Sequence, residues 1–242
     1  MTLLDRIAIL SALAAATALA WWYTAAMPGM GDPSTLHPWT ARDAAIAFAM
    51  WAIMMVGMML PSATPMTLIY AQVVRKAARD GSVMPPTAVF VAGYLAAWTL
   101  FSAAATAAQW GLERAALLSP MLVATSPRLG AGLLIAAGVW QFTPWKNACL
   151  SHCRSPVHYF AANFRPGARG ALRLGFRYGL YCLGCCWLIM ALLFVGGVMN
   201  LFWIAALSVF VLAEKAFSRG LWGSRIAGLA MIAAGAWLFA SA

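Results

Sequence analysis

Long apolar runs separated by short polar segments dominate the pattern along this 242-residue chain. The runs Ile7 to Ala26, Thr87 to Ala108 and Tyr178 to Met199 each approach the roughly 20 residues that a helix needs to cross a bilayer. A helix satisfies its own backbone hydrogen bonds in lipid, where water is absent. The pattern therefore predicts an all-α, polytopic helical membrane protein embedded in the lipid bilayer.

The apolar runs divide the chain into about seven transmembrane helices. No segment suggests a second, soluble domain, so residues 1–242 are expected to form a single transmembrane helical-bundle domain. The fourth and sixth runs are shorter than the others. The predicted spans are 7–26, 44–60, 87–108, 129–143, 178–199, 200–214 and 224–241.

Composition supports this class, because 64% of the residues are hydrophobic and only 9% are charged. The first span ends in Ala18-Leu19-Ala20, which resembles the cleavage site of a signal peptide. Asp5 beside Arg6 nevertheless leaves the N-terminal charge weak, and the apolar run continues into Trp21. We therefore expect the first span to remain part of the protein.

The formal net charge of +10 carries information about orientation, because Lys and Arg accumulate in cytoplasmic loops of membrane proteins. With the N-terminus in the cytoplasm, only Arg42, Arg114 and Arg128 of the 16 basic residues fall outside. The charges predict a multi-pass protein of the cell inner membrane. They flank apolar spans rather than form a solvated domain, so no nucleic-acid partner is expected. The basic segment 146–177 is predicted to be a cytoplasmic interfacial loop, with an amphipathic helix on the inner leaflet as the alternative.

Two short clusters of cysteine and histidine share one spacing. Positions i, i+3 and i+4 of a helix lie on one face, so each cluster presents three thiol or imidazole groups in one direction. Such soft ligands favour Cu(I), Zn(II) or iron–sulfur chemistry. The predicted topology places both clusters at the cytoplasmic side, where thiols stay reduced and disulfides are disfavoured. The clusters are Cys149-x-x-His152-Cys153 and Cys182-x-x-Cys185-Cys186.

A methionine-rich stretch runs from Met50 to Met59 in the second predicted span. Thioethers bind Cu(I) without losing a proton, although methionine also packs apolar interfaces as a flexible filler. Met58 and Met59 end at the same predicted level as the cysteines. They are therefore additional candidate ligands, with packing as the alternative.

The polar residues at the span ends offer no catalytic signature. Lys146 and Lys215 lie where lysines often snorkel, and Glu214 has a structural role or a ligand role as alternatives. The chain lacks a phosphate-binding glycine loop, a Ser-His-Asp order and a dinucleotide fingerprint. No catalytic residue and no organic cofactor are predicted, and an enzyme is the less favoured class.

Five stretches together resemble a family of uncharacterised multi-spanning bacterial membrane proteins described as predicted metal-binding. The resemblance implies an integral membrane protein that binds a metal, without naming a reaction. The stretches are Trp51-x-x-Met-Met-x-x-Met-Met-x-Pro-Ser62, Thr143-Pro-x-Lys-x-x-Cys-Leu-x-x-Cys-Arg-x-Pro156, Gly179-x-x-Cys-x-Gly-Cys-Cys-Trp187, Gly197-x-Met-Asn200 and Glu214-Lys215.

These observations predict a membrane protein that binds a soft transition-metal ion, Cu(I) first and Zn(II) second, at a cytoplasmic-side Cys/Met cluster. Its role would be metal transport or metalloenzyme maturation, with a metallochaperone or metalloenzyme as acceptor. The alternatives are a membrane thiol-disulfide oxidoreductase, favoured by the C-x-x-C spacing, and a structural subunit of a membrane complex. The candidate ligands are Cys149, His152, Cys153, Cys182, Cys185, Cys186, Met58 and Met59.

Overall fold

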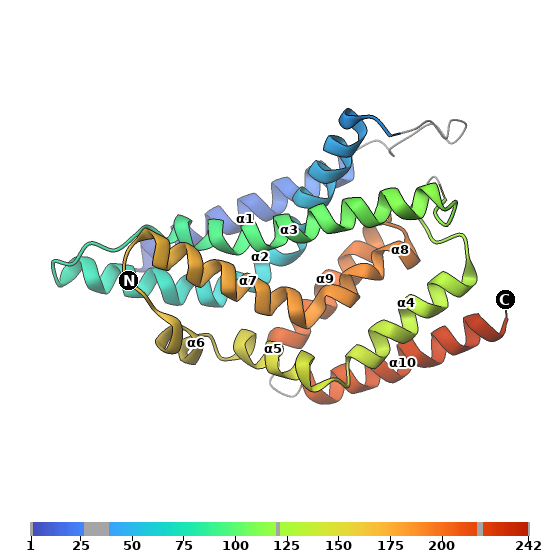
Figure 1. Cartoon of the computed structure of the whole chain (residues 1–242). Coiled ribbons are helices and arrows are strands. Elements are labelled where there is room, and N and C mark those ends of the chain that lie inside the picture. The colour runs from blue at the N-terminus through green and yellow to red at the C-terminus, as the bar shows by residue number, and fades with distance from the viewer. Residues whose placement is uncertain (1, 27–38, 120–121, 217–219, 242) are drawn as a thin grey trace.

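The computed structural model describes residues 2–26, 39–119, 122–216 and 220–241, and all regular elements within them are helices (Figure 1). The all-α expectation is confirmed. The described helices are α1 (Leu3–Ala26), α2 (Ala41–Arg79), α3 (Thr87–Arg114), α4 (Pro127–Trp140), α5 (Pro144–Arg154), α6 (Pro156–Asn163), α7 (Ala168–Ala191), α8 (Leu193–Gly196), α9 (Leu201–Ala216) and α10 (Gly220–Ala240).

Five of the described helical segments are long and apolar enough to cross a membrane. They comprise α1, α2, α3, the combined α7–α8 segment and most of α10. The two shortest predicted spans coincide with α4 and α9, which have 14 and 16 residues. The start of α1 and the end of α10 lie toward opposite ends of the bundle (Figure 1).

Helix α2 continues far beyond the predicted end at Leu60, through Pro61 and Pro65. A proline leaves the carbonyl four residues earlier without its helical partner. Here the indole of Trp21, on α1, donates to the Gly57 carbonyl at 3.2 Å. A neighbouring helix thus satisfies the group that Pro61 releases, and α2 passes through the proline instead of stopping.

Close helix–helix approach at glycines organises the bundle. A Cβ atom on Gly175 of α7 would collide with the Phe90 carbonyl of α3, and one on Gly93 would collide with the Leu172 carbonyl. At the α4–α10 contact, a Cβ on Gly138 would lie 2.7 Å from the Gly228 carbonyl oxygen. Small residues at such points let backbones approach and gain packing contacts that lipid cannot supply.

The segment 146–177, predicted as an interfacial loop, is mostly helical, so that prediction was wrong. It forms α5, α6 and the first turns of α7, and Tyr159 of α6 is buried with a relative exposure of 1%. Rings from neighbouring helices bury this one side chain of α6, including Tyr178, whose ring centroid lies 5.5 Å from that of Tyr159. Sequence periodicity over such short helices is too brief to reveal this packing.

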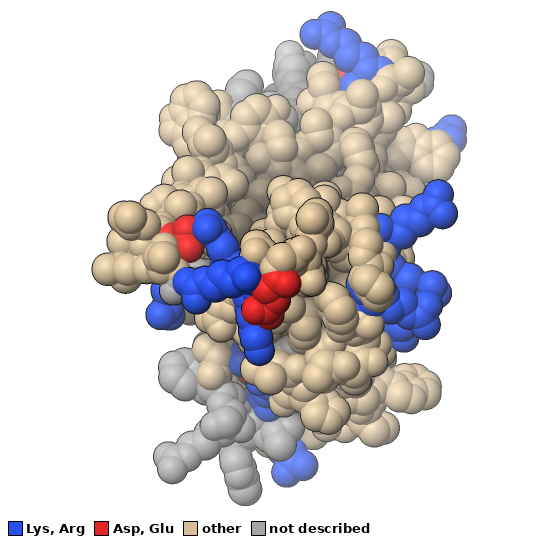
Figure 2. Space-filling model, turned by 90° about the vertical axis from the view of Figure 1, so that its left-hand side faces the viewer, with Lys and Arg blue, Asp and Glu red and all other residues tan. Residues whose placement is uncertain are grey.

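The same end of the molecule carries exposed basic side chains from several elements. Figure 2 views this end and shows Lys and Arg around its rim, with few acidic groups between them. Arg75 pairs with Asp5 of α1, which ties the beginning of α1 to the last turn of α2. The exposed basic residues here include Arg6, Arg75, Lys76, Arg79, Arg165, Arg169, Arg173 and Arg177.

Candidate metal centre

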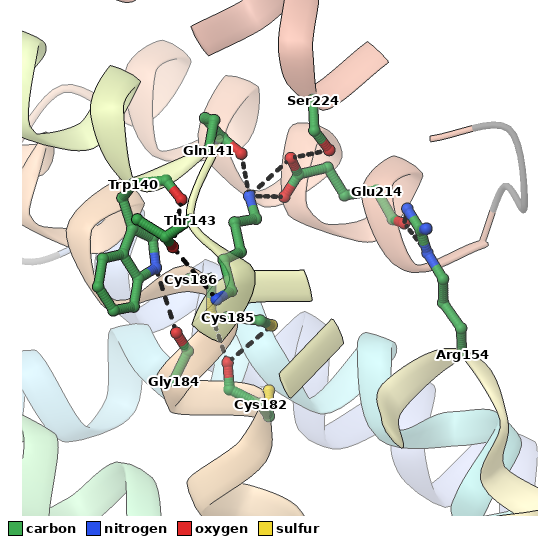
Figure 3. Close-up of polar contacts among 11 residues, drawn as sticks. Trp140, Gln141, Thr143, Arg154, Cys182, Gly184, Cys185, Cys186, Glu214 and Ser224 are labelled. Carbon is green, nitrogen blue, oxygen red and sulfur yellow. Dashed lines mark hydrogen bonds and ion pairs between the residues drawn. The ribbon is translucent and has the colours of Figure 1, made fainter. Parts of the chain in front are cut away.

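The three cysteines of α7 lie together on its buried face. Cys182, Cys185 and Cys186 are 1%, 1% and 0% exposed. The thiols of Cys185 and Cys186 donate to the Cys182 carbonyl at 3.0 and 2.9 Å (Figure 3). Because α7 begins at Ala168, these cysteines lie well inside the helix and not near its start, as the predicted span 178–199 implied.

Helix α5 brings the second cluster to α7. Its start is fixed by Thr143, whose hydroxyl accepts from the Lys146 backbone N–H at 3.2 Å, with Pro144 in the first turn. The Cys149 sulfur packs so close to Gly184 of α7 that a Cβ there would lie 2.8 Å from it. The Cys149 thiol therefore lies against α7 at Gly184, the residue before Cys185.

Cys153 joins this contact, because its buried thiol lies close to the thiol of Cys185. That neighbouring thiol, together with burial, raises the pKa of Cys153 well above its usual value. Burial, and then the Cys185 thiol, raise the pKa of Cys149. The raised pKa values favour the protonated form of both α5 thiols at neutral pH.

A polar group from a third helix reaches the α7 cysteines. The ammonium of Lys215, at the end of α9, donates to the Cys182 sulfur at 2.8 Å and to the Ser62 hydroxyl at 2.9 Å. The Tyr94 hydroxyl of α3 lies 3.0 Å from the same sulfur and donates to the Met59 carbonyl at 3.0 Å. Cys182 thus stands at the junction of α2, α3, α7 and α9.

The candidate methionines lie in the same buried core as the cysteines. Met58 and Met59 are 3% and 0% exposed. The backbone of Met59 is linked to the Cys182 sulfur through Tyr94. Their burial is compatible with both packing and ligation, so their role as ligands stays a prediction.

His152 has a different environment from the thiols. Its Nδ1 atom lies 2.7 Å from the Ala148 carbonyl, and its ring stacks on Tyr181 at 4.2 Å between centroids. The Tyr159 ring meets it edge-on at 6.0 Å. The structure therefore places His152 against an aromatic cluster, whereas its predicted partners on α5 face the α7 sulfurs.

A fully buried ion pair lies beside the thiols (Figure 3). The Lys146 ammonium, 0% exposed, donates to both carboxylate oxygens of Glu214 at 2.8 Å and also to the Gln141 amide oxygen. Ser224 of α10 donates to Glu214 at 2.6 Å, and Arg154 donates to the Glu214 carbonyl. Neither lysine at this level snorkels; Lys146 serves to join α5, α9 and α10.

All five cysteines are free, and all of them belong to the buried core or pack against it. Among the residues described, no three His, Cys, Asp or Glu side chains are already grouped as a metal site. The thiols of Cys185 and Cys186 instead donate to the Cys182 carbonyl. A change of side-chain rotamer would free these thiols from the carbonyl. The donor set fits a soft monovalent ion, because thiolates and thioethers select Cu(I).

Sequence reasoning missed two residues of the centre. Tyr94 lay in an apolar run with no polar neighbour to single it out. Ser62 appeared only as the last residue of a quoted motif, although its position after Pro61 was a usable signal. Lys215 was noted, but its inward direction toward Cys182 depends on how α9 packs against α2 and α7.

Comparison with known families decides how this centre is classified. Residues 48–238 match the family described as PpoB2, copper chaperone. The chain belongs to this copper-chaperone family. The match begins within α2 and ends in α10, so it includes all five cysteines and supports the predicted relation to copper. Searches among curated proteins and among solved structures found no match.

Proposed function

We propose that this protein is a multi-pass inner-membrane copper chaperone that binds Cu(I) through cysteine thiolates and passes it to a metalloenzyme or metallochaperone. The ligands are drawn from the two thiol clusters and the adjacent methionines. The observation that carries the proposal is the meeting of Cys149 and Cys153 with the α7 cysteines. Membership of a copper-chaperone family supports the metal.

Neighbouring sulfurs suit transfer by ligand exchange. An ion bound to one thiolate forms a bond to the next before the first bond breaks, so it is never released bare into a low-dielectric core. Cys153 and Cys185 come from different helices and are already in contact, so the ion can pass between α5 and α7. Zn(II) is the second candidate ion, because thiolates also bind it well.

The distribution of charge supports an N-terminus in the cytoplasm. The beginnings of α1, α3 and α7 share the end of the bundle that carries exposed basic side chains (Figures 1 and 2). Positive charge of this kind marks the cytoplasmic side of inner-membrane proteins. In this orientation seven helices cross the bilayer, with α4 and α9 as the short ones.

The test is an anaerobic Cu(I) titration of the purified, reduced protein against a competing chelator. Wild type is expected to bind copper stoichiometrically, and Cys182→Ser/Cys185→Ser/Cys186→Ser is expected to lose it. Ser151→Ala on α5 is the matched control, because Ser151 is exposed and its hydroxyl donates only to the Ala148 carbonyl of its own helix. Failure of wild type to bind Cu(I), or unchanged binding by the triple variant, refutes the proposal.

One observation favours a second function. The thiols of Cys153 and Cys185 come from different helices and lie close together, which suits reversible disulfide formation, the chemistry of a thiol-disulfide oxidoreductase. That function predicts a reversible thiol titration with no stoichiometric copper. A protein showing neither copper binding nor thiol redox chemistry would be a structural subunit.

A further inference from the structure

The three lysines of the chain have three different environments. Lys76 is exposed at the basic end of the bundle. Lys146 is completely buried and paired with both carboxylate oxygens of Glu214. Lys215 is half-buried, and its ammonium points inward to the Cys182 sulfur at 2.8 Å.

The partners of Lys215 leave its charge without a carboxylate. Among the described residues, its ammonium contacts the Ser62 hydroxyl and the Cys182 sulfur, and the Tyr94 hydroxyl borders the same sulfur. Glu214 is adjacent in sequence but is fully engaged by Lys146 and Ser224. Among the described residues, the Lys215 ammonium therefore has no carboxylate partner and is directed at the Cys182 sulfur.

This charge has a defined consequence for a metal site. Two thiolates and one monovalent ion carry a net charge of minus one, which is costly in a low-dielectric interior. An adjacent ammonium brings the total to zero. With a divalent ion in the same two-thiolate site, the ammonium instead leaves an excess of one positive charge.

We infer that Lys215 is the counter-cation of a two-thiolate metal site containing Cys182, and that it makes this site select monovalent soft ions over divalent ones. The inference rests on the proposed function and adds a determinant of specificity to it. Ser62 also accepts a hydrogen bond from the ammonium, and Cys185 and Cys186, whose thiols donate to the Cys182 carbonyl, are the candidates for the second thiolate.

The test compares ion preference in Lys215→Met, Lys215→Gln and Lys215→Arg. Affinities for Cu(I), Ag(I) and Zn(II) are measured by competition with chelators on the reduced, detergent-solubilised full chain. Loss of one charge contact is expected to weaken Cu(I) and Ag(I) on the order of tenfold in Lys215→Met, while Zn(II) binding holds or improves. Lys215→Arg keeps the charge and is expected to keep the wild-type ratio of affinities.

Two controls separate selectivity from folding. Lys76→Met removes an exposed lysine and is expected to change none of the affinities. Lys215→Gln keeps a polar end, so it supplies the neutral variant if Lys215→Met does not fold. An equal loss for monovalent and divalent ions, or an unchanged ratio in both neutral variants, overturns the inference. Absence of Cu(I) binding by wild type instead refutes the proposed function.

Discussion

Two neighbouring polar regions of this bundle each contain a lysine ammonium, and the partners of the two ammonium groups differ. In the ion-pair region, Lys146 and Glu214 neutralise each other, and Ser224 takes up a remaining carboxylate lone pair. In the thiol region, Lys215 meets a sulfur and a hydroxyl, neither of which carries a permanent negative charge. The first region is neutral by itself, whereas the second contains the cysteines that are proposed to bind a metal ion.

Adjacent residues of one helix can therefore contact different parts of the bundle. Glu214 and Lys215 follow each other on α9, yet the first points to α5 and α10 and the second to α2 and α7. The ion pair anchors Glu214 to α5 and α10, and Lys215 is the next residue of the same helix. The pair therefore helps to hold Lys215 near the Cys182 sulfur.

The largest expected effect comes from removing one partner of the Lys146–Glu214 ion pair. Glu214→Gln leaves the Lys146 ammonium, 0% exposed, without an anion. Removing one partner of a buried pair costs about 3–5 kcal/mol, so a marked fall in the unfolding midpoint in detergent is expected. Adding Lys146→Met to this variant is expected to restore much of the loss, because no buried charge then remains unpaired. If Glu214→Gln alone were as stable as wild type, the Lys146–Glu214 pair would not be needed to neutralise a buried charge.

A smaller effect is expected at the contact between α5 and α7. Gly184→Ala places a Cβ within 2.8 Å of the Cys149 sulfur and displaces it from α7. Copper affinity is expected to fall on the order of tenfold, about 1.4 kcal/mol, with every thiol still present. Competition with a Cu(I) chelator measures this change.

The matched control for this prediction is Gly111→Ala on α3, where a Cβ meets nothing within 4 Å. Combining Gly184→Ala with Cys149→Ser is expected to weaken binding no more than Cys149→Ser does alone, since both act on one ligand. Additive losses would show that Gly184 acts through something other than Cys149.

The smallest expected effect concerns the orientation of α5. Thr143→Ala removes the hydroxyl that caps this helix and is expected to lower the free energy of unfolding by about 1 kcal/mol. Thr99→Ala on α3 also removes a threonine hydroxyl, but from an exposed mid-helix position that bonds only its own helix. Denaturant unfolding measures the free energy of unfolding of both variants. If Thr143→Ala and Thr99→Ala were equally stable, the Thr143 cap would have no role in stabilising the protein.

The sequence predicted the helical class and the approximate position of each apolar helix, because hydrophobic run length is a local property. It ended the second span at Leu60, where a proline normally interrupts a helix. The helix continues because the indole of Trp21, which is distant in sequence, donates a hydrogen bond to the Gly57 carbonyl that Pro61 leaves without a partner. The helical packing of 146–177 was missed for the same reason, since rings on other helices bury Tyr159.

For the candidate site, the i, i+3 and i+4 spacing by itself determined that the cysteines of each cluster share a helix face, because helical geometry fixes which side chains are neighbours. Only the tertiary structure decided that Cys149 meets Gly184, that Lys146 pairs with Glu214, and that Lys215 reaches Cys182. These contacts join residues up to 68 positions apart. They depend on how close the helices approach and how they are rotated, which no local pattern encodes.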